Sequence, residues 1–180
     1  MRRRFYVLGL CTFLVSGSSL AETTAAVDVV LNPAGSFRAE TKKVTGYAYK
    51  TKDGVAAENI KVDLRTLTTG VSLRDQHTKK RLHTDKHPFA KLVKATGKGG
   101  IGKGIVEIKG MRREVTGTYK IVGKELQAEF PLTLTELQIT DANYMGVGVD
   151  DKMVLKVNVP LKDRAPASAG KATKKPKAKK

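Results

Sequence analysis

Regular alternation of apolar and polar residues is the feature that most restricts how this chain can fold. Apolar side chains recur at every second position in five stretches, around residues 27–31, 60–64, 115–121, 126–134 and 153–159. Neighbouring side chains of a β-strand point to opposite faces, so a period of two predicts strands with one buried face. Four shorter stretches have the same character: GSFRAET, KVTGYAYK, FAKLVKATG and GIVEIKG. The chain is therefore predicted to contain eight or nine strands.

Short turn signals separate these strands, among them Asn32-Pro33, Asp53-Gly54, Lys109-Gly110 and Gly123-Lys124. Strands of this length joined by short turns are typical of an antiparallel meander. A sheet of that size avoids exposed edges most simply by closing on itself. We therefore predict an all-β fold built on an antiparallel, eight-stranded closed barrel.

The interior of an eight-stranded barrel is wide enough to be filled by side chains or to hold one small ligand. The sequence has no Trp and five Phe, so most candidate inward residues are aliphatic. Such a lumen suits a flexible aliphatic guest better than a planar aromatic one, but a packed core has the same composition, and both interiors stay open here. The candidate lumen residues are Leu31, Phe37, Val44, Tyr47, Ile60, Val62, Leu64, Val115, Tyr119, Ile121, Leu126, Phe130, Leu132, Met153, Leu155 and Val157.

One stretch, VSLRDQHTKKRLHTDKHP, interrupts the strand pattern and predicts a short helix at about residues 72–82. Ser72 and Asp75 have the S-x-x-D spacing of a capping box at a helix start. Basic residues gather in the last turn, where they suit the helix dipole. We expect the helix to lie across the barrel as a plug, tied to neighbouring backbone by Arg74, Asp75 and His77.

Three histidines, His77, His83 and His87, raise the question of a metal site in this stretch. Pro88 disfavours the helical geometry that would bring the last two onto one face, and no fourth ligand is evident. A hydrolytic site made from the serine, aspartate and first histidine of the helix is too local for a nucleophile, base and orienter. We therefore predict no metal site, no catalytic residue, no cofactor and no enzymatic activity.

The first 21 residues, MRRRFYVLGLCTFLVSGSSLA, have the pattern of a secretory signal peptide cleaved after Ala21. An uncleaved membrane anchor is the alternative reading. The apolar run is shorter than the roughly 20 residues that span a bilayer, which favours the cleaved signal. Cys11, the single cysteine, lies in this segment. We therefore expect an exported protein whose mature form has neither disulfides nor thiol chemistry.

The charge of the chain is strongly basic, with 34 Lys and Arg against 17 Asp and Glu. Residues 165–180, APASAGKATKKPKAKK, carry six lysines and no acidic residue, and we expect a disordered tail there. Such a tail could hold an anionic membrane or envelope polymer, or act only as a solubilising extension. We expect no nucleic-acid partner. Between signal and tail, residues 22–164 are expected to form one domain.

At this point the sequence resembles a known family. The run LTTGVSLRDQHTKKRLHTDKHPFAKL is similar to the signature of the YceI-like family, with its T-G segment, R-D-x-H element and following Pro segment in that order. GIVEIKGMRREVTG and FPLTLTELQITDANYMGVGVDDKMVLKVNV agree with it, so the resemblance covers roughly residues 27–161. It implies a secreted, lipocalin-like barrel whose apolar tunnel binds a polyisoprenoid or another long amphiphile. The residues that match the family motif, which we expect to be architectural, are Gly70, Arg74, Asp75, His77, Pro88, Gly110 and Gly146.

Three departures from the family pattern bear on the ligand: His87 stands where many members have an aromatic residue before Pro88, the segment before Ile60 is abbreviated, and the basic tail is an addition. The expected function is that of a periplasmic binding or carrier protein for a long apolar amphiphile, a polyisoprenoid, quinone or fatty-acid-like lipid. The alternative is a basic interaction module that attaches to anionic membrane or envelope polymer through surface and tail lysines. A dimer is compatible with the sequence.

Overall fold

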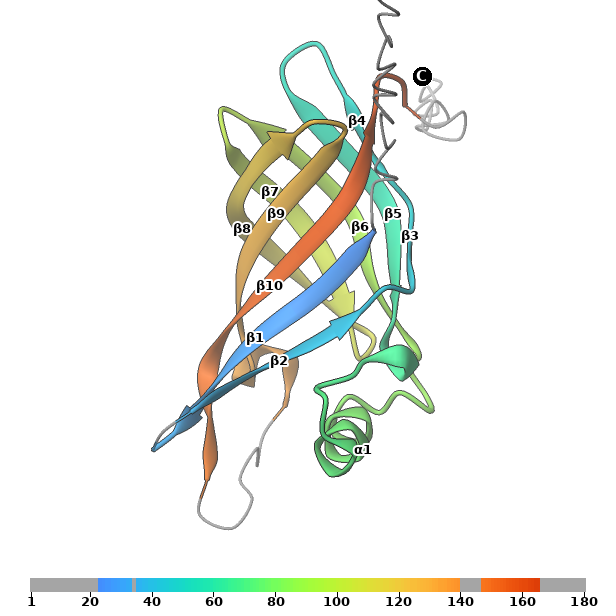
Figure 1. Ribbon diagram of the computed structural model, residues 1–180. Helices are drawn as coiled ribbons and strands as arrows, with labels where there is room; N and C mark the ends of the chain where they lie inside the picture. Colours follow the sequence, from blue (N-terminus) through green and yellow to red (C-terminus); the bar gives the residue numbers. More distant parts are fainter. Residues whose placement is uncertain (1–22, 34, 140–146, 166–180) are drawn as a thin grey trace, which may run out of the picture.

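The computed structural model describes residues 23–33, 35–139 and 147–165 (Figure 1). The predicted signal peptide, the predicted tail beyond residue 165 and Gly146 lie outside these residues. The described part contains ten strands, one α-helix and two 3₁₀ helices. In chain order these are β1 (Thr24–Asn32), β2 (Ser36–Thr41), β3 (Val44–Thr45), β4 (Ala48–Lys50), β5 (Val55–Asp63), η1 (Leu64–Thr66), α1 (Ser72–Arg81), β6 (Phe89–Lys98), β7 (Ile101–Ile108), β8 (Met111–Val122), β9 (Glu125–Thr133), η2 (Thr135–Leu137) and β10 (Gly148–Lys162).

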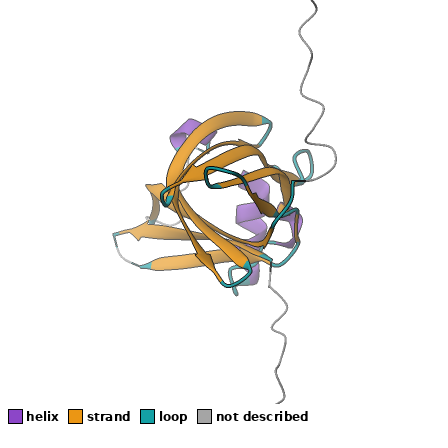
Figure 2. Ribbon diagram, turned by 90° about the horizontal axis from the view of Figure 1, so that it is seen from above, coloured by secondary structure: helices purple, strands orange, loops and turns teal. Residues whose placement is uncertain are grey.

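The sheet closes through β10, the longest strand. Strands β4 to β9 follow one another as antiparallel neighbours, β9 pairs along one edge of β10, and the C-terminal end of β10 pairs with β4. Seven strands thus form a closed ring, which is visible from above in Figure 2. The predicted all-β, lipocalin-like closed barrel with one short helix is confirmed.

The number of strands in the ring differs from the predicted eight. The first hairpin, β1–β2, pairs with β10 from Gly148 to Asn158, so it occupies most of the edge that would otherwise meet β4. Only Leu161 and Lys162 remain to pair with the three-residue strand β4. The hairpin therefore lies beside the ring as a flange, as Figure 1 shows.

The inward faces of the ring form one apolar core. Val159 of β10 and Leu137 of η2 are its most deeply buried large side chains, each 1% exposed. The cluster also includes Val106 of β7 and Phe130 of β9. None of the helices among the described residues is long and apolar enough to cross a membrane.

An ion-pair cluster on the outer face ties the flange together. Asp28 of β1 lies directly opposite Arg38 of β2. The Arg38 guanidinium donates to both carboxylate oxygens of Asp28, at 2.6 and 3.0 Å, and the Lys156 ammonium of β10 lies 3.0 Å from the same carboxylate. The hydrogen bond from Arg38, together with Lys156, lowers the pKa of Asp28 to about 2.

We expect Asp28→Asn to destabilise the fold at neutral pH by roughly 0.5–1 kcal/mol, since it removes a partly exposed double ion pair. A carboxyl whose folded pKa is depressed stabilises the fold above its ordinary pKa, here 3.8, and this contribution disappears as the pH falls through about 2. Urea unfolding across this window should therefore show the two proteins converging at low pH. Asp53→Asn, in the turn after β4, is the control and should change little, because Asp53 makes no ion pair with the described residues. A pH-independent difference for Asp28→Asn would contradict the assignment.

Candidate binding cavity

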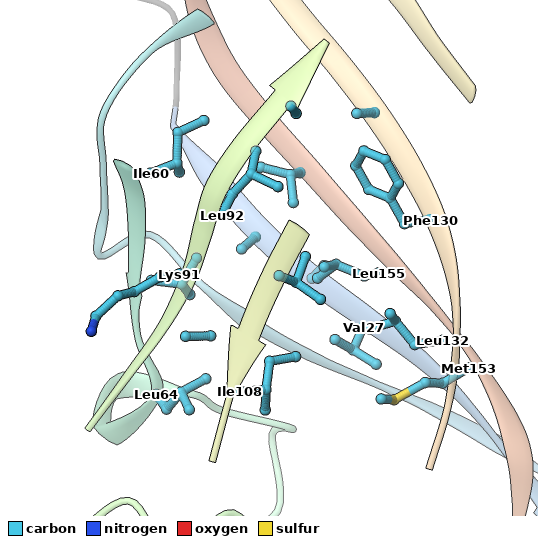
Figure 3. A pocket seen from close by; sticks show the side chains of 18 of the residues that line it. Val27, Ile60, Leu64, Lys91, Leu92, Ile108, Phe130, Leu132, Met153 and Leu155 are labelled. Carbon is cyan, nitrogen blue, oxygen red and sulfur yellow. The ribbon is translucent and has the colours of Figure 1, made fainter. Parts of the chain in front are cut away.

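The barrel contains a partly open cavity of about 220 Å³ whose wall is almost entirely apolar. Figure 3 looks into it, with Phe130, Leu132, Met153 and Leu155 on one side and Leu92 on the other. Residues from every strand of the ring, from the flange and from α1 contribute to its lining. The interior is therefore hollow along the barrel and is not filled by its own side chains.

Alanines at inward positions create the hollow. Ala25, Ala48, Ala57 and Ala128 are all buried and all line the cavity. A leucine or isoleucine at these positions would fill the space, as the larger aliphatic residues do in an ordinary close-packed core. The hydrophobic pattern alone does not reveal this, because alanine reads as a weak apolar signal.

The two ends of the cavity are bordered by different elements. At the β4 end only the seven ring strands surround it, and Val55, Leu126 and Val159, buried residues of the core cluster, line it. At the other end β1 and β2 enter between β10 and β5, and the space beneath them is bordered by η1 and α1 (Figure 1). We call the end that the ring strands alone surround the narrow end, and the end that the flange and α1 border the wide end.

Helix α1 covers part of the wide end without packing deeply. Thr78 and Arg81 of α1, and Leu82 just after it, line the cavity. None of the helix residues is buried. The helix therefore rests on the barrel as a cover, which agrees in position with the predicted plug.

The start of α1 differs from the predicted capping box. The N-cap residue is Val71, and Ser72 is the first residue of the helix. The Asp75 carboxylate reaches back instead: Oδ1 accepts hydrogen bonds from the Thr69 backbone N–H at 2.7 Å and the Thr69 hydroxyl at 2.6 Å, and Oδ2 accepts from the Thr68 hydroxyl at 3.1 Å. The bonds from Thr69 hold the pKa of Asp75 below its usual value.

Two tethers connect α1 to strand β2. Thr68, which bonds to Asp75, also exchanges two backbone hydrogen bonds with Glu40 of β2, at 2.9 and 3.0 Å. The Arg74 guanidinium lies 4.6 Å from the ring centroid of Phe37, also on β2, in a cation–π contact. The family motif residues Arg74 and Asp75 therefore hold the cover in place, and His77 also makes an interaction.

The remaining motif residues lie at turns around the same end. Gly70 and Gly110 have φ of +78° and +76°, which residues with a side chain rarely adopt. The Pro88 carbonyl accepts a hydrogen bond of 2.9 Å from the Leu64 backbone N–H. His87 lies against Gly110, where an added Cβ would come within 3.2 Å of its Cε1 atom. The histidine that departs from the family pattern is thus packed against the β7–β8 turn.

Among the described residues, no group of three or more His, Cys, Asp or Glu side chains is arranged to hold a metal ion. One charged residue of the wall, Lys91, points its ammonium group outward. The stem of Lys91 lines the wall, but its ammonium points away (Figure 3) and lies 3.0 Å from Glu107. Glu107 also accepts a hydrogen bond of 2.9 Å from Arg112, and these two bonds lower its pKa.

Eleven of the sixteen candidate lumen residues line the cavity: Phe37, Ile60, Val62, Leu64, Tyr119, Leu126, Phe130, Leu132, Met153, Leu155 and Val157. Val44 and Val115 are buried in the same core but do not line the hollow. In both groups, period-two reasoning chose the face that points inward.

Three candidate residues lie away from the cavity, each for a local reason. Leu31 follows a register irregularity near the far end of the flange. Tyr47 lies between β3 and β4 with the Lys162 ammonium 4.0 Å above its ring. Ile121 pairs with the inward Leu126, but it lies at the end of β8 and is 48% exposed.

Several lining residues have no counterpart among the candidates. They are the alanines, the inward positions of β6 and β7 such as Leu92, Val106 and Ile108, the residues after β9 such as Leu137, and the α1 residues. In the strand positions of this set, the alternation of apolar and polar residues is short or interrupted by glycine. The helix residues carry no lumen signal, because their contact with the cavity depends on where the helix docks.

Comparison with known proteins finds a family and solved structures with this architecture. The family model described as YceI-like domain matches residues 16–161. The crystal structure of BcnA from Burkholderia cenocepacia is similar with a TM-score of 0.56 and 14% identity, covering 75% of this chain and 94% of that one. A polyisoprenoid binding domain from Saccharophagus degradans, implicated in plant cell wall breakdown, is similar with a TM-score of 0.54 and 9% identity, covering 77% and 93%. At these identities the two structures establish a shared fold. No curated protein matches the chain.

We expect Asp75→Asn to loosen α1 while leaving the barrel intact, because the change removes the charge that accepts three hydrogen bonds. Amide hydrogen exchange in residues 72–81 should become several times faster, whereas exchange in β8 and β9 should not change. Asp85→Asn, an exposed carboxylate just beyond the helix, is the matched control. Equal exchange in α1 of both variants would show that Asp75 does not hold the cover.

Proposed function

The chain belongs to the YceI-like domain family, and from this membership we propose that its barrel holds a long apolar amphiphile: a polyisoprenoid, a quinone or a fatty-acid-like lipid. The observation that carries the proposal is the hollow of about 220 Å³ with an almost wholly apolar wall. The flexible aliphatic lining matches an alkyl or isoprenoid chain in shape and polarity. The Saccharophagus degradans domain, which shares the fold, is a polyisoprenoid binding domain, and this supports the same class of ligand.

Burial of an alkyl chain is sufficient to drive such binding. Each methylene moved from water into the lumen contributes roughly 0.8 kcal/mol, so no charged residue is required inside. Part of this gain is lost, because the free lipid already lies in a membrane or micelle. Selectivity then depends on the length of the lumen and on the groups that meet the polar head.

The role we propose is binding or carriage in the periplasm, without catalysis. The MRRRFYVLGLCTFLVSGSSLA segment supports export. We propose that the ligand enters at the wide end, because α1 borders the cavity there and none of the helix residues is buried. A helix that buries none of its residues can move away from the barrel without unfolding it.

Leu155 and its neighbour Val154 on β10 offer a matched test. Leu155 lines the cavity, whereas Val154 points outward and is 36% exposed. Leu155→Gln should weaken lipid binding about tenfold or more, since a lipid chain would desolvate an amide without bonding to it. Val154→Gln should bind as the unchanged protein does.

The measurement combines native mass spectrometry with organic extraction of protein purified from its own host, followed by titration with the lipid recovered. Thermal unfolding of both variants checks that the barrel remains folded. Protein recovered empty from lipid-rich material, or equal binding by both variants, would count against a ligand in the lumen.

A second candidate function rests on the tail. Its six lysines without an acidic residue favour contact with an anionic membrane or envelope polymer, at about 1 kcal/mol per lysine near such a surface. Deletion of residues 165–180 should then weaken cosedimentation with anionic vesicles and reduce its salt dependence, while lipid held in the lumen is retained. Zwitterionic vesicles serve as the control. Unchanged vesicle binding would assign the tail no such role.

A further inference from the structure

Three glycines lie side by side on the inner wall near the narrow end of the barrel. Gly97 of β6 pairs with Gly102 of β7, and Gly102 pairs with Gly117 of β8. Three neighbouring strands therefore present bare backbone to the interior at one level. Glycine weakens a strand interior, so a run of this kind usually indicates a close approach by another group.

Two aromatic rings lie on this bare wall. A Cβ on Gly97 would come within 2.5 Å of the Tyr119 ring, and one on Gly117 would come within 2.7 Å of the Phe130 ring. A Cβ on Gly102 would lie 3.8 Å from both rings, which is ordinary contact distance. Tyr119 and Phe130 thus both pack against the surface formed by the three glycines, which we call the glycine seat. Both residues also line the cavity.

We propose that Tyr119 and Phe130 form the end wall of the lumen and set the longest chain that it accepts. This inference rests on the proposed binding of a long amphiphile. At this end only the seven ring strands surround the cavity, and Val55, Leu126 and Val159 are buried and complete its lining. In this proposal the hydrocarbon tail ends against the two rings, which are the largest side chains that line the cavity at this end.

The position of the polar head follows from the opposite end. Thr78 and Arg81 are the polar side chains that α1 contributes to the lining, and they lie at the wide end. A chain that enters there keeps its head beside the helix and sends its tail towards Tyr119 and Phe130. The distance from helix to rings then fixes the chain length.

The glycine seat makes this end wall firm. Phe130 is 5% exposed, so it cannot move towards solvent without losing its burial. On the wall side, both rings already touch backbone. A chain one carbon too long must therefore leave a methylene outside the wide end or displace a ring, and it loses the roughly fourfold gain in affinity that each buried methylene gives.

The test uses a homologous series of saturated fatty acids, with affinity measured by displacement of a fluorescent fatty acid from the full chain. For the unchanged protein, affinity should rise about fourfold per methylene and then stop rising at one chain length. Tyr119→Ala should move this limit to longer chains, because it opens the seat. Gly102→Val should move it to shorter chains, because new methyl groups enter between the rings.

Two further variants keep the outcome clear. Phe130→Leu removes part of the end wall with a milder loss of core than alanine, and should also lengthen the limit. Tyr47→Ala, an aromatic residue that does not line the cavity, should leave the limit unchanged. Thermal unfolding identifies any variant that does not fold. The chain-length limits of the variants that do fold then decide the test.

The possible failures are distinguishable. If the unchanged protein binds no member of the series, nor lipid from its host, the proposed function itself fails. If it binds the series but the limit stays the same in Tyr119→Ala, Phe130→Leu and Gly102→Val, the end-wall role is overturned. A longer limit for Tyr119→Ala and Phe130→Leu, together with a shorter limit for Gly102→Val, establishes the end-wall role.

Discussion

Closure of the ring through β10 is the constraint on which the rest of this structure depends. Pairing with β9 and with β4 leaves the ring without an open edge and separates an inner face from an outer one. The contact with β4 involves only two residues at the C-terminal end of β10, so the ring closes there. The β1–β2 hairpin occupies the remainder of the edge and borders the opposite end. The difference between the two ends of the cavity follows from this unequal sharing of one strand.

A hollow barrel carries a free-energy cost that a packed one does not. If nothing filled it, an apolar cavity of about 220 Å³ would cost at most on the order of 5 kcal/mol at roughly 24 cal/mol per Å³. Whole domains are stable by only about 5–15 kcal/mol. Larger residues in place of buried alanines such as Ala48 and Ala57 would therefore make the folded barrel more stable. A ligand that fills the space would recover part of that stability, which links the alanine pattern to binding.

The sequence predicts which face of each strand points inward better than it predicts what that face encloses. Alternation places Leu155 inside and Val154 outside, and the structure agrees. It cannot place Ile121, because burial at a strand end depends on how far the neighbouring hairpin extends. It also misassigns the start of α1, because Asp75 bonds to Thr69, two residues before the N-cap. These details depend on tertiary docking, which a local pattern does not encode.

The two ends of the lumen differ in how firmly they are held. At the narrow end, side chains from non-adjacent strands are buried together, so opening it requires disruption of the ring. At the wide end, α1 has no buried residue, and its identified tethers both lead to β2, which belongs to the flange and not to the ring. Segments with few buried contacts open at a small fraction of the global unfolding free energy. For the proposed function, this means that a ligand could exchange past α1 while the barrel that would shield its chain from water stays folded.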